Sequence, residues 1–237
     1  RKTLPKSFID RNTYSPYVVL YDETADQVLY SKNADEKCYP ASLTKIMTCL
    51  LALEKGDLDN TVTVSPSALE NLDSAGSTAG LLVGEELSLL NLLYCVMISS
   101  ANEACNVVAE HIAGSVENFV EMMNTRAQEL GCTGTHFANA HGLHDEEHYS
   151  TAQDMALIVQ EALTHDLFRT ITNTSYYLLP ATNLSEERKL YTTNKLIVEG
   201  GANEYYYSKA SGVKTGFTTP AGRCLISTAS NGNLQLL

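Results

Sequence analysis

Basic residues are scarce in this sequence of 237 residues. It has 16 lysines and arginines against 28 aspartates and glutamates, which gives a formal net charge of −12 at pH 7. Binding to the phosphate backbone of nucleic acids needs clustered lysine and arginine. The composition therefore argues against a nucleic-acid partner.

Long apolar runs are missing as well. The longest candidates, residues 46–53 and 87–98, are interrupted by polar side chains and fall short of the roughly 18 residues that span a bilayer. The sequence also has no internal repeat and no linker rich in proline and serine. Its length then predicts one large domain, or one domain with a subdomain.

No C-x-x-C pair occurs among the six cysteines, which removes the main support for zinc-ribbon and thioredoxin-like architectures. Most of the cysteines have apolar neighbours, as in Thr48-Cys49-Leu50. We expect buried free thiols that pack as small apolar side chains. In an exported protein, an even number of cysteines would also allow disulfides.

The order of the periodic segments predicts an α+β fold, with strands first, helices in the middle and strands again at the end. Two β-prone runs around the polar turn Thr24-Ala-Asp26 predict a hairpin over residues 17–30. The predicted helices are residues 42–53, a segment opening at Ser65-Pro66, 89–98, 104–113, 119–130 and 151–163, and the later strands are 175–179, 188–192, 208–215 and 223–229, followed by a turn at Asn231-Gly232.

Ser42-Leu-Thr-Lys45 is an S-x-x-K motif at the start of a predicted helix. Residues three apart share one helix face, so the Lys45 amine would lie beside the Ser42 hydroxyl. Serine is unreactive as a neutral alcohol and needs a base within hydrogen-bond reach, which an unprotonated lysine can supply. The helix N-terminus adds a backbone N–H and a positive dipole end for a developing oxyanion. This pattern predicts an activated serine nucleophile.

The motif alone has low specificity, because a serine three residues before a lysine is expected about once in a chain of this length. Ser211-Gly-Val-Lys214 is a second S-x-x-K, but it falls in a predicted strand, where residues three apart face opposite sides. Two S-x-N motifs also occur, at Ser31 and at Ser100-Ala-Asn102. The one at Ser100 lies between two predicted helices, where a short turn can project into a cleft.

Lys214-Thr215-Gly216 is a K-T-G motif that occurs once. On a strand, its lysine and threonine would flank a groove, and the glycine would let a ligand lie against the backbone. S-x-x-K, S-x-N and K-T-G in this order are the residue set of penicillin-binding proteins and serine β-lactamases.

Five short stretches of sequence, found in order along the chain, narrow the resemblance from this superfamily to one family. From about Tyr17 to its C-terminus, the sequence resembles the D-alanyl-D-alanine carboxypeptidases, the low-molecular-mass penicillin-binding proteins of the S11 peptidase type. The resemblance implies that residues 1–237 form a serine DD-peptidase catalytic domain with a β-lactamase/DD-peptidase-like α+β fold. In this fold, helices flank an antiparallel sheet, and a segment of about residues 60–165 forms a largely helical subdomain. The five blocks are Tyr39-Pro-Ala-Ser-Leu-Thr-Lys45, Ser100-Ala-Asn-Glu-Ala104, Asn139-Ala-His-Gly-Leu143, Ser150-Thr-Ala-Gln-Asp-Met-Ala156 and Gly212-Val-Lys-Thr-Gly-Phe217.

The resemblance implies catalytic roles for matched residues. Ser42 would be the acylated nucleophile and Lys45 its general base. Ser100 would relay a proton to the leaving amine, and Asn102 would hold a substrate amide. Lys214 would place positive charge near Ser100 and help to keep Lys45 unprotonated by like-charge repulsion.

The substrate-binding residues implied by the resemblance come from the K-T-G block. Thr215 would hydrogen-bond the terminal carboxylate of the substrate, beside Lys214 and Gly216. The backbone N–H groups of Ser42 and Phe217 would form the oxyanion hole.

The expected function is removal of the terminal D-alanine from peptidoglycan stem peptides that end in D-Ala-D-Ala, through an acyl-enzyme on Ser42. The resemblance implies covalent inhibition by β-lactams, no cofactor or metal, and a place in the bacterial cell envelope outside the cytoplasm. Family members usually continue past the K-T-G strand into further sheet, often with a β-rich domain and an amphipathic membrane anchor. We therefore expect the C-terminal end of the sheet to be truncated, and membrane contact only through an anchor outside this chain.

Two alternatives retain the serine machinery. A serine β-lactamase would share the acylation step, but the E-x-x-L-N loop that directs water in class A enzymes is absent from the sequence. A penicillin-binding fragment without turnover would result if the missing C-terminal segment were needed to hold the K-T-G strand.

A third alternative is an inverted zincin, suggested by His144-Asp-Glu-Glu-His148 with His136 and His141 close by. Such a site needs both histidines on one face of a helix. Gly142 stands just before the motif, and a helix is predicted to start just after it. The segment is therefore expected to be a solvated acidic loop.

Overall fold

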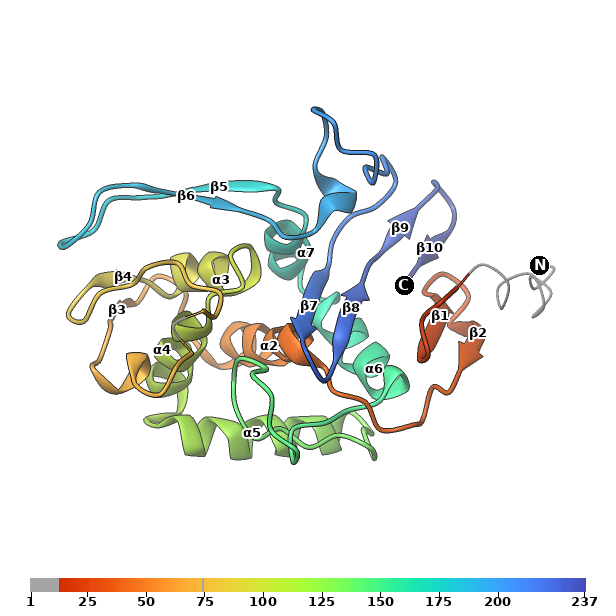
Figure 1. Cartoon of the computed structure of the whole chain (residues 1–237), viewed down its shortest axis with the longest axis horizontal. Coiled ribbons are helices and arrows are strands. Elements are labelled where there is room, and N and C mark those ends of the chain that lie inside the picture. Colours follow the sequence, from red (N-terminus) through yellow and green to blue (C-terminus); the bar gives the residue numbers. More distant parts are fainter. Residues whose placement is uncertain (1–12, 74) are drawn as a thin grey trace.

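The structure is a computed structural model that describes residues 13–73 and 75–237, with helices in the middle and strands around them (Figure 1). All pairings between its named strands are antiparallel, within sheets of order β2-β1-β10-β9, β3-β4, β5-β6 and β7-β8. The strands are β1 (Val18–Asp22), β2 (Gln27–Lys32), β3 (Thr61–Thr63), β4 (Glu86–Ser88), β5 (Tyr176–Leu179), β6 (Arg188–Tyr191), β7 (Lys214–Thr218), β8 (Gly222–Ile226), β9 (Ala229–Ser230) and β10 (Gln235–Leu236). The predicted α+β architecture is confirmed.

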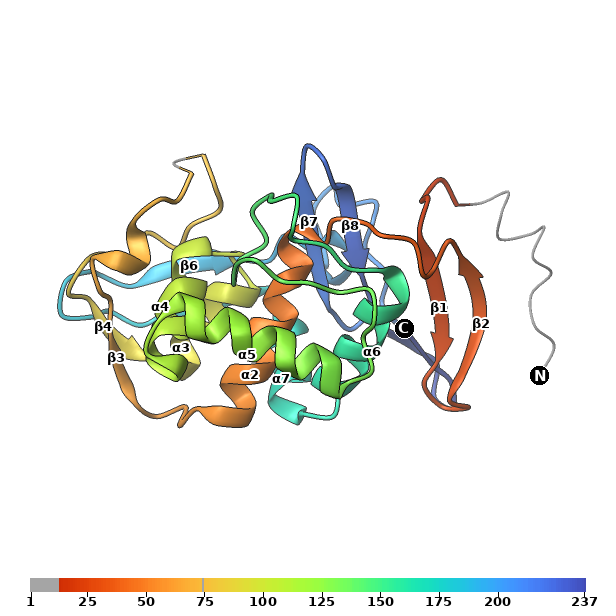
Figure 2. The same cartoon turned by 90° about the horizontal axis from the view of Figure 1, so that it is seen from below.

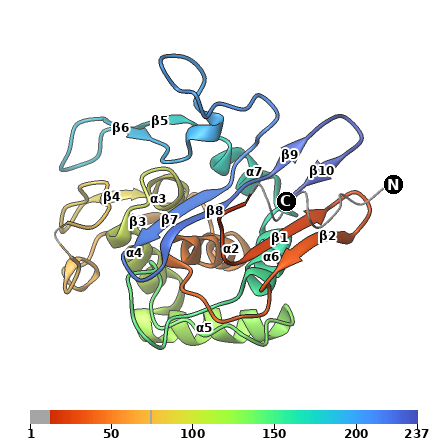
Figure 3. The same ribbon diagram turned by 45° about the vertical axis from the view of Figure 1, so that its right-hand side comes forward.

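The first hairpin forms as predicted, because Asp22 closes its turn. The Oδ1 atom of Asp22 accepts hydrogen bonds from the backbone N–H groups of Thr24 and Ala25, at 2.9 and 3.1 Å. The predicted turn at Asn231-Gly232 is also confirmed, and it joins β9 to β10. Figure 3 shows β9 and β10 extending from the end of β8 toward β1, with which β10 pairs.

One strand starts later than predicted. The expected strand over residues 208–215 begins only at Lys214, because Gly212 has a φ of 122°, which interrupts regular strand geometry. Ser211 and Val213 still donate backbone hydrogen bonds to Thr228 and Ile226, both at 2.9 Å. The segment before β7 is therefore held beside the end of β8 and the residues that follow it, without being a strand itself.

The helices begin and end near the predicted signals. Ser88 and Thr151 cap α3 and α6 by accepting hydrogen bonds from Asn91 N and Asp154 N, and Gly114 ends α4 with a φ of 81°. The short α7 was not predicted. The helices are α2 (Lys45–Lys55), α3 (Leu89–Met97), α4 (Asn102–Ala113), α5 (Val116–Glu129), α6 (Ala152–Ala162) and α7 (Asp166–Thr172), with 3₁₀ turns η1 (Ala41–Thr44), η2 (Ser67–Leu69) and η3 (Lys195–Ile197).

The prediction of a helix that opens at Ser65-Pro66 is wrong, because only the single turn η2 forms there. The capping signal itself is real, since Ser65 Oγ accepts a hydrogen bond from Ala68 N at 3.1 Å. The chain then leaves the helical conformation at Glu70, whose ψ is 151°, and Asn71 has a φ of 57°. A cap without a following amphipathic run does not sustain a helix.

Helix α2 forms the centre of the core. Helices α3, α4, α5 and α6 all contact it, and Figure 2 shows α5 running across the side of α2 and α4. The side chains from Ile46 to Ala52 are fully buried. The one hydroxyl among them, that of Thr48, donates to Ala140 O at 2.6 Å, so its burial leaves no unsatisfied donor. This burial holds the N-terminal end of α2 rigidly in place.

All six cysteines lie among the described residues and are free thiols. Four are buried, as expected, whereas Cys38 and Cys224 are half-buried. No helix in the described part of the chain has the length and apolar character that crossing a bilayer requires.

A buried ion pair attaches the β5–β6 hairpin to the helical part of the molecule. Arg188 donates to Glu85, whose side chain has no exposed surface, and to Gly80 O at 2.9 Å. Glu85 also accepts hydrogen bonds from Leu82 N and from the Thr182 hydroxyl, both at 2.9 Å. These contacts connect β6, the hairpin loop and the segment before β4.

We predict that Glu85→Ala lowers the free energy of unfolding by about 3 kcal/mol or more, because it leaves the largely buried Arg188 guanidinium without its anion. Urea denaturation followed by circular dichroism measures this change. Glu86→Ala is the matched control, since Glu86 is exposed and its loss should cost no more than about 0.5 kcal/mol. Equal effects of the two substitutions would contradict this role of the pair.

Candidate active site

Ser42 lies in η1, the 3₁₀ turn that leads directly into α2, instead of in the first turn of an α-helix as predicted. Its neighbours come unusually close. A Cβ atom on Gly142 would lie 1.9 Å from Ala41 O, and one on Gly216 would lie 3.0 Å from Ser42 N. Both glycines are therefore needed for the chain to surround Ser42 this closely, and Gly216 brings β7 beside the Ser42 backbone.

Lys45 lies against Ser42, as the S-x-x-K motif predicts, and is fully buried. Its Nζ atom is 3.0 Å from Ser42 Oγ, 2.8 Å from Asn102 Oδ1 and 2.6 Å from His141 O. None of these three oxygens belongs to a carboxylate. Burial lowers the pKa of Lys45 to about 8, against smaller opposing effects of Cys105 and Glu103.

Ser100 and Lys214 form a second contact between hydroxyl and amine. Ser100 lies between α3 and α4 with a φ of 57°, a strained conformation for a residue with a side chain. Lys214 Nζ donates to Ser100 Oγ at 3.1 Å and to Thr215 O at 2.9 Å. Burial, followed by repulsion from Lys45, lowers the pKa of Lys214 to about 7.

The side chain of Lys214 is 2% exposed and lies behind the cleft, whereas the sequence suggested that it flanks a groove. This position explains its contact with Ser100. The second S-x-x-K is a coincidence, as expected, because the Ser211 hydroxyl contacts Thr228 Oγ1 at 2.9 Å while Lys214 bonds Ser100.

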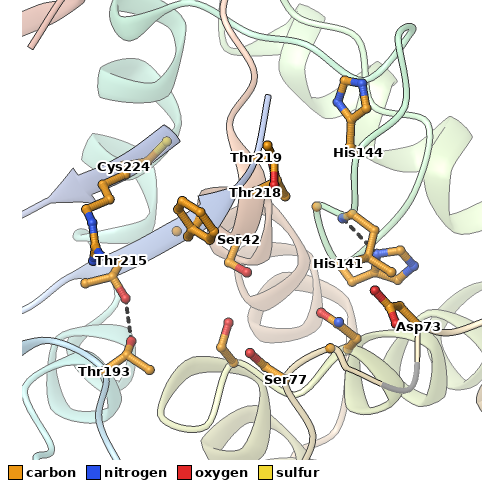
Figure 4. A pocket seen from close by; sticks show the side chains of 18 of the residues that line it. Ser42, Asp73, Ser77, His141, His144, Thr193, Thr215, Thr218, Thr219 and Cys224 are labelled. Atoms are coloured by element: carbon orange, nitrogen blue, oxygen red, sulfur yellow. Dashed lines mark hydrogen bonds between the residues drawn. The ribbon is translucent and has the colours of Figure 1, made fainter. Parts of the chain in front are cut away.

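Figure 4 shows the Ser42 side chain pointing into a cleft between β7 and the loop that carries His141. Thr215 lies on the β7 side, where its hydroxyl is hydrogen-bonded to that of Thr193. The Phe217 side chain is 63% exposed beside it. The other predicted residues that line this cleft are Ser100, Asn102 and Gly216.

The histidines of the zincin-like motif lie in a loop, as expected, but only residues 144–147 are exposed, because His148 is buried. His148 accepts a hydrogen bond from Ala138 N at Nδ1 and contacts Thr44 Oγ1 through Nε2, at 2.9 and 2.7 Å. His144 packs edge-on against Tyr39. Burial lowers the pKa of His141 to about 3 and that of His148 to about 4. Within residues 13–73 and 75–237, no three His, Cys, Asp or Glu side chains gather as metal ligands.

Two parts of the site contain none of the residues that were predicted from the sequence. Thr193 follows β6 and contacts Thr215 from 22 positions away, and the segment with Gly76 and Ser77 lines the cleft beside Asn102. Neither carries a motif or a periodic pattern. Only the tertiary fold brings them to the cleft.

Comparisons with known proteins agree with this geometry. The chain is 39% identical over 222 residues to the D-alanyl-D-alanine carboxypeptidase DacF of Bacillus subtilis, and 36% identical over 230 residues to DacC of Escherichia coli. Both alignments cover 92% of this chain, but only 55% and 54% of the relatives' own lengths.

Solved structures show the same fold. The crystal structure of the Streptomyces K15 DD-transpeptidase superposes with a TM-score of 0.83 and 30% identity, over 92% of this chain and 86% of that one. The D-alanyl-D-alanine carboxypeptidase of Mycobacterium tuberculosis H37Rv gives a TM-score of 0.83 and 27% identity, over 94% and 80%.

The family model described as D-alanyl-D-alanine carboxypeptidase, peptidase S11, matches residues 8–237. With the Ser42–Lys45 contact and the shared fold, this match establishes that the chain belongs to the S11 family of D-alanyl-D-alanine carboxypeptidases.

Proposed function

We propose that this chain is a serine-type carboxypeptidase that removes the terminal D-alanine from peptidoglycan stem peptides ending in D-Ala-D-Ala. The single observation that carries the proposal is the contact of 3.0 Å between Ser42 Oγ and the buried Lys45 amine. Because the chain aligns with only 55% and 54% of the lengths of these relatives, the activity assigned to residues 1–237 is a proposal about this part of the protein. The proposed reaction uses no cofactor.

The first step in this mechanism is transfer of a proton from Ser42 to Lys45. Asn102 Oδ1 and His141 O can only accept hydrogen bonds. A neutral Lys45 amine keeps both by donating its two protons to them, which directs its lone pair at the Ser42 hydroxyl. The neutral amine then takes the Ser42 proton as Oγ attacks the substrate carbonyl.

The acyl-enzyme forms when the leaving D-alanine amine receives a proton. We assign this relay to Ser100, and the support is that its hydroxyl accepts from Lys214 and that it lines the cleft with Ser42. We assign the oxyanion hole to the backbone N–H groups of Ser42 and Phe217, which the close approach of Gly216 supports. Water then hydrolyses the Ser42 ester.

Substrate binding in this proposal uses the cleft beside β7. Thr215 hydrogen-bonds the terminal carboxylate of the peptide, Asn102 holds a substrate amide, and Gly216 leaves room for the peptide against the strand. β-Lactams, which present a strained amide and a carboxylate, would acylate Ser42 by the same route. We place the substrate in the bacterial cell envelope outside the cytoplasm.

Benzylpenicillin should form a single covalent adduct on Ser42. Intact-mass measurement and peptide mapping detect the adduct, and an assay for released D-alanine on a D-Ala-D-Ala peptide tests turnover. Ser42→Ala should lose both signals, whereas Ser211→Ala, in the second S-x-x-K, should keep both. An adduct on another serine would refute the assignment. A rapidly hydrolysed adduct without D-alanine release would indicate a β-lactamase, and a stable adduct without D-alanine release a binding fragment.

Lys45→Ala should slow acylation of Ser42 by roughly three decades or more, because the substitution removes the base that activates the hydroxyl. Lys214→Ala should slow acylation and weaken substrate binding together, since it removes the amine that holds the Ser100 hydroxyl and the Thr215 carbonyl. Stopped-flow measurement of the acylation rate against substrate concentration separates the two effects. Acylation of Lys45→Ala at the original rate would mean that another residue is the base.

The acylation rate should rise with pH and reach a plateau above about 8, because the pKa of Lys45 is about 8 and its base form must be neutral. Below that pKa the rate should fall by about tenfold per pH unit, as protonation removes the lone pair. Benzylpenicillin acylation measured from about pH 5.5 to 9.5 tests this. A rate that stays constant or falls across this interval would contradict Lys45 as the base.

A further inference from the structure

Glu103 directly follows Asn102 at the start of α4, and its side chain is buried. Its Oε1 atom accepts two short hydrogen bonds, from Thr78 Oγ1 at 2.6 Å and from Ala79 N at 2.7 Å. The mechanism above gives this carboxylate no task. A carboxylate buried this close to the reacting groups needs a physical explanation.

The two hydrogen bonds hold the segment from Gly76 to Ala79 against the active site. Asn102 N adds a third contact by donating to Ser77 O at 2.9 Å. A Cβ atom on Gly76 would lie 2.8 Å from Asn102 Nδ2, so this segment packs directly on the Asn102 amide. The other end of that amide, Oδ1, is the atom that accepts from Lys45 at 2.8 Å.

Cys105 and Glu103 both raise the pKa of the Lys45 amine and so oppose the effect of burial. Burial raises the pKa of the Cys105 thiol to about 11 and lowers those of His141 and His148 to about 3 and 4. Glu103 is the carboxylate among the groups that raise this pKa, and it lies next in sequence to Asn102, whose Oδ1 atom is 2.8 Å from Lys45 Nζ. The other titratable groups around Lys45 are Cys49 on its own helix, Cys105 on α4, Lys214 on β7, and His141 and His148 in the loop after α5.

We infer that Glu103 is a positioning residue with two effects: it holds the segment from Gly76 to Ala79 against the Asn102 amide, and it sets the charge balance of the Lys45 amine. This inference rests on the proposed function only where Lys45 acts as a base. Glu103 contacts neither the reacting atoms nor the cleft surface that would bind substrate. It acts through Asn102 and Lys45.

Glu103→Gln separates the two effects, because the amide oxygen can still accept from Thr78 and Ala79 while the charge is lost. NMR titration of protein labelled with ¹³C at lysine Cε measures the Lys45 pKa directly, and Lys45→Arg identifies the signal. We expect Glu103→Gln to lower the Lys45 pKa by about one unit. Glu110→Gln is the matched control. Glu110 lies seven residues, about 10.5 Å, further along the same helix and, like Glu103, accepts two hydrogen bonds, in its case from the side chains of Ser65 and Ser67. It should leave the Lys45 pKa unchanged.

Glu103→Ala removes both the charge and the acceptor. Its acylation by benzylpenicillin, measured on the pH plateau where Lys45 is neutral, should be slower than that of Glu103→Gln by on the order of tenfold or more. Thermal unfolding of both variants measures their folded fractions, and so shows whether a lower acylation rate comes only from a lower fraction of folded protein.

Two results would overturn the inference. A Lys45 pKa that is equal in Glu103→Gln and in the unsubstituted chain would exclude the effect on charge. Equal plateau rates for Glu103→Ala and Glu103→Gln would exclude the effect on position. If the unsubstituted chain is not acylated, the proposed function fails, while the Lys45 titration still decides whether Glu103 controls its charge.

Discussion

The site depends on the burial of one lysine without a carboxylate in direct contact. Lys45 is held by two oxygens that can only accept hydrogen bonds and by the Ser42 hydroxyl, at the start of a helix whose side chains are buried from Lys45 to Ala52. An ammonium ion in this position loses hydration and gains only neutral acceptors in return, so its neutral form becomes accessible near pH 8. In our account, the reactivity of Ser42 follows from this one physical constraint.

Other features of the fold protect this arrangement. Gly142 and Gly216 allow the loop after α5 and strand β7 to approach the turn that carries Ser42, where a side chain would collide at position 142 and be tightly packed at position 216. Lys214, buried beneath β7, adds a second amine whose pKa is lowered partly by Lys45, so the two amines disfavour each other's protonation. The pocket is thus formed by segments that lie far apart in the sequence, and the positions of its side chains depend on how these segments pack together.

The sequence predicted well those features that are local. The S-x-x-K spacing brought Ser42 and Lys45 together because residues three apart share a face in a 3₁₀ turn as well as in an α-helix, and the caps at Ser88 and Thr151 form as expected. The contact of Lys214 with Ser100 spans 114 positions, and only the ordered set of motifs pointed to it. The contact of Lys45 with Asn102, over 57 positions, was not predicted. Thr193 and the segment around Gly76 could not be found, because tertiary packing alone gives them their place. The helix expected at Ser65 failed for a related reason: a cap is a local signal, but a helix also needs an apolar face to bury.

Neutron diffraction from the uncomplexed protein, crystallised in D₂O at a pH about one unit above the pKa of Lys45, tests the central claim most directly. Our account predicts two deuterons on Lys45 Nζ, donated to Asn102 Oδ1 and His141 O, and a deuteron on Ser42 Oγ directed at Nζ. Three deuterons on Nζ, with one of them directed at Ser42 Oγ, would show that Lys45 is a cation there and would contradict its role as the base.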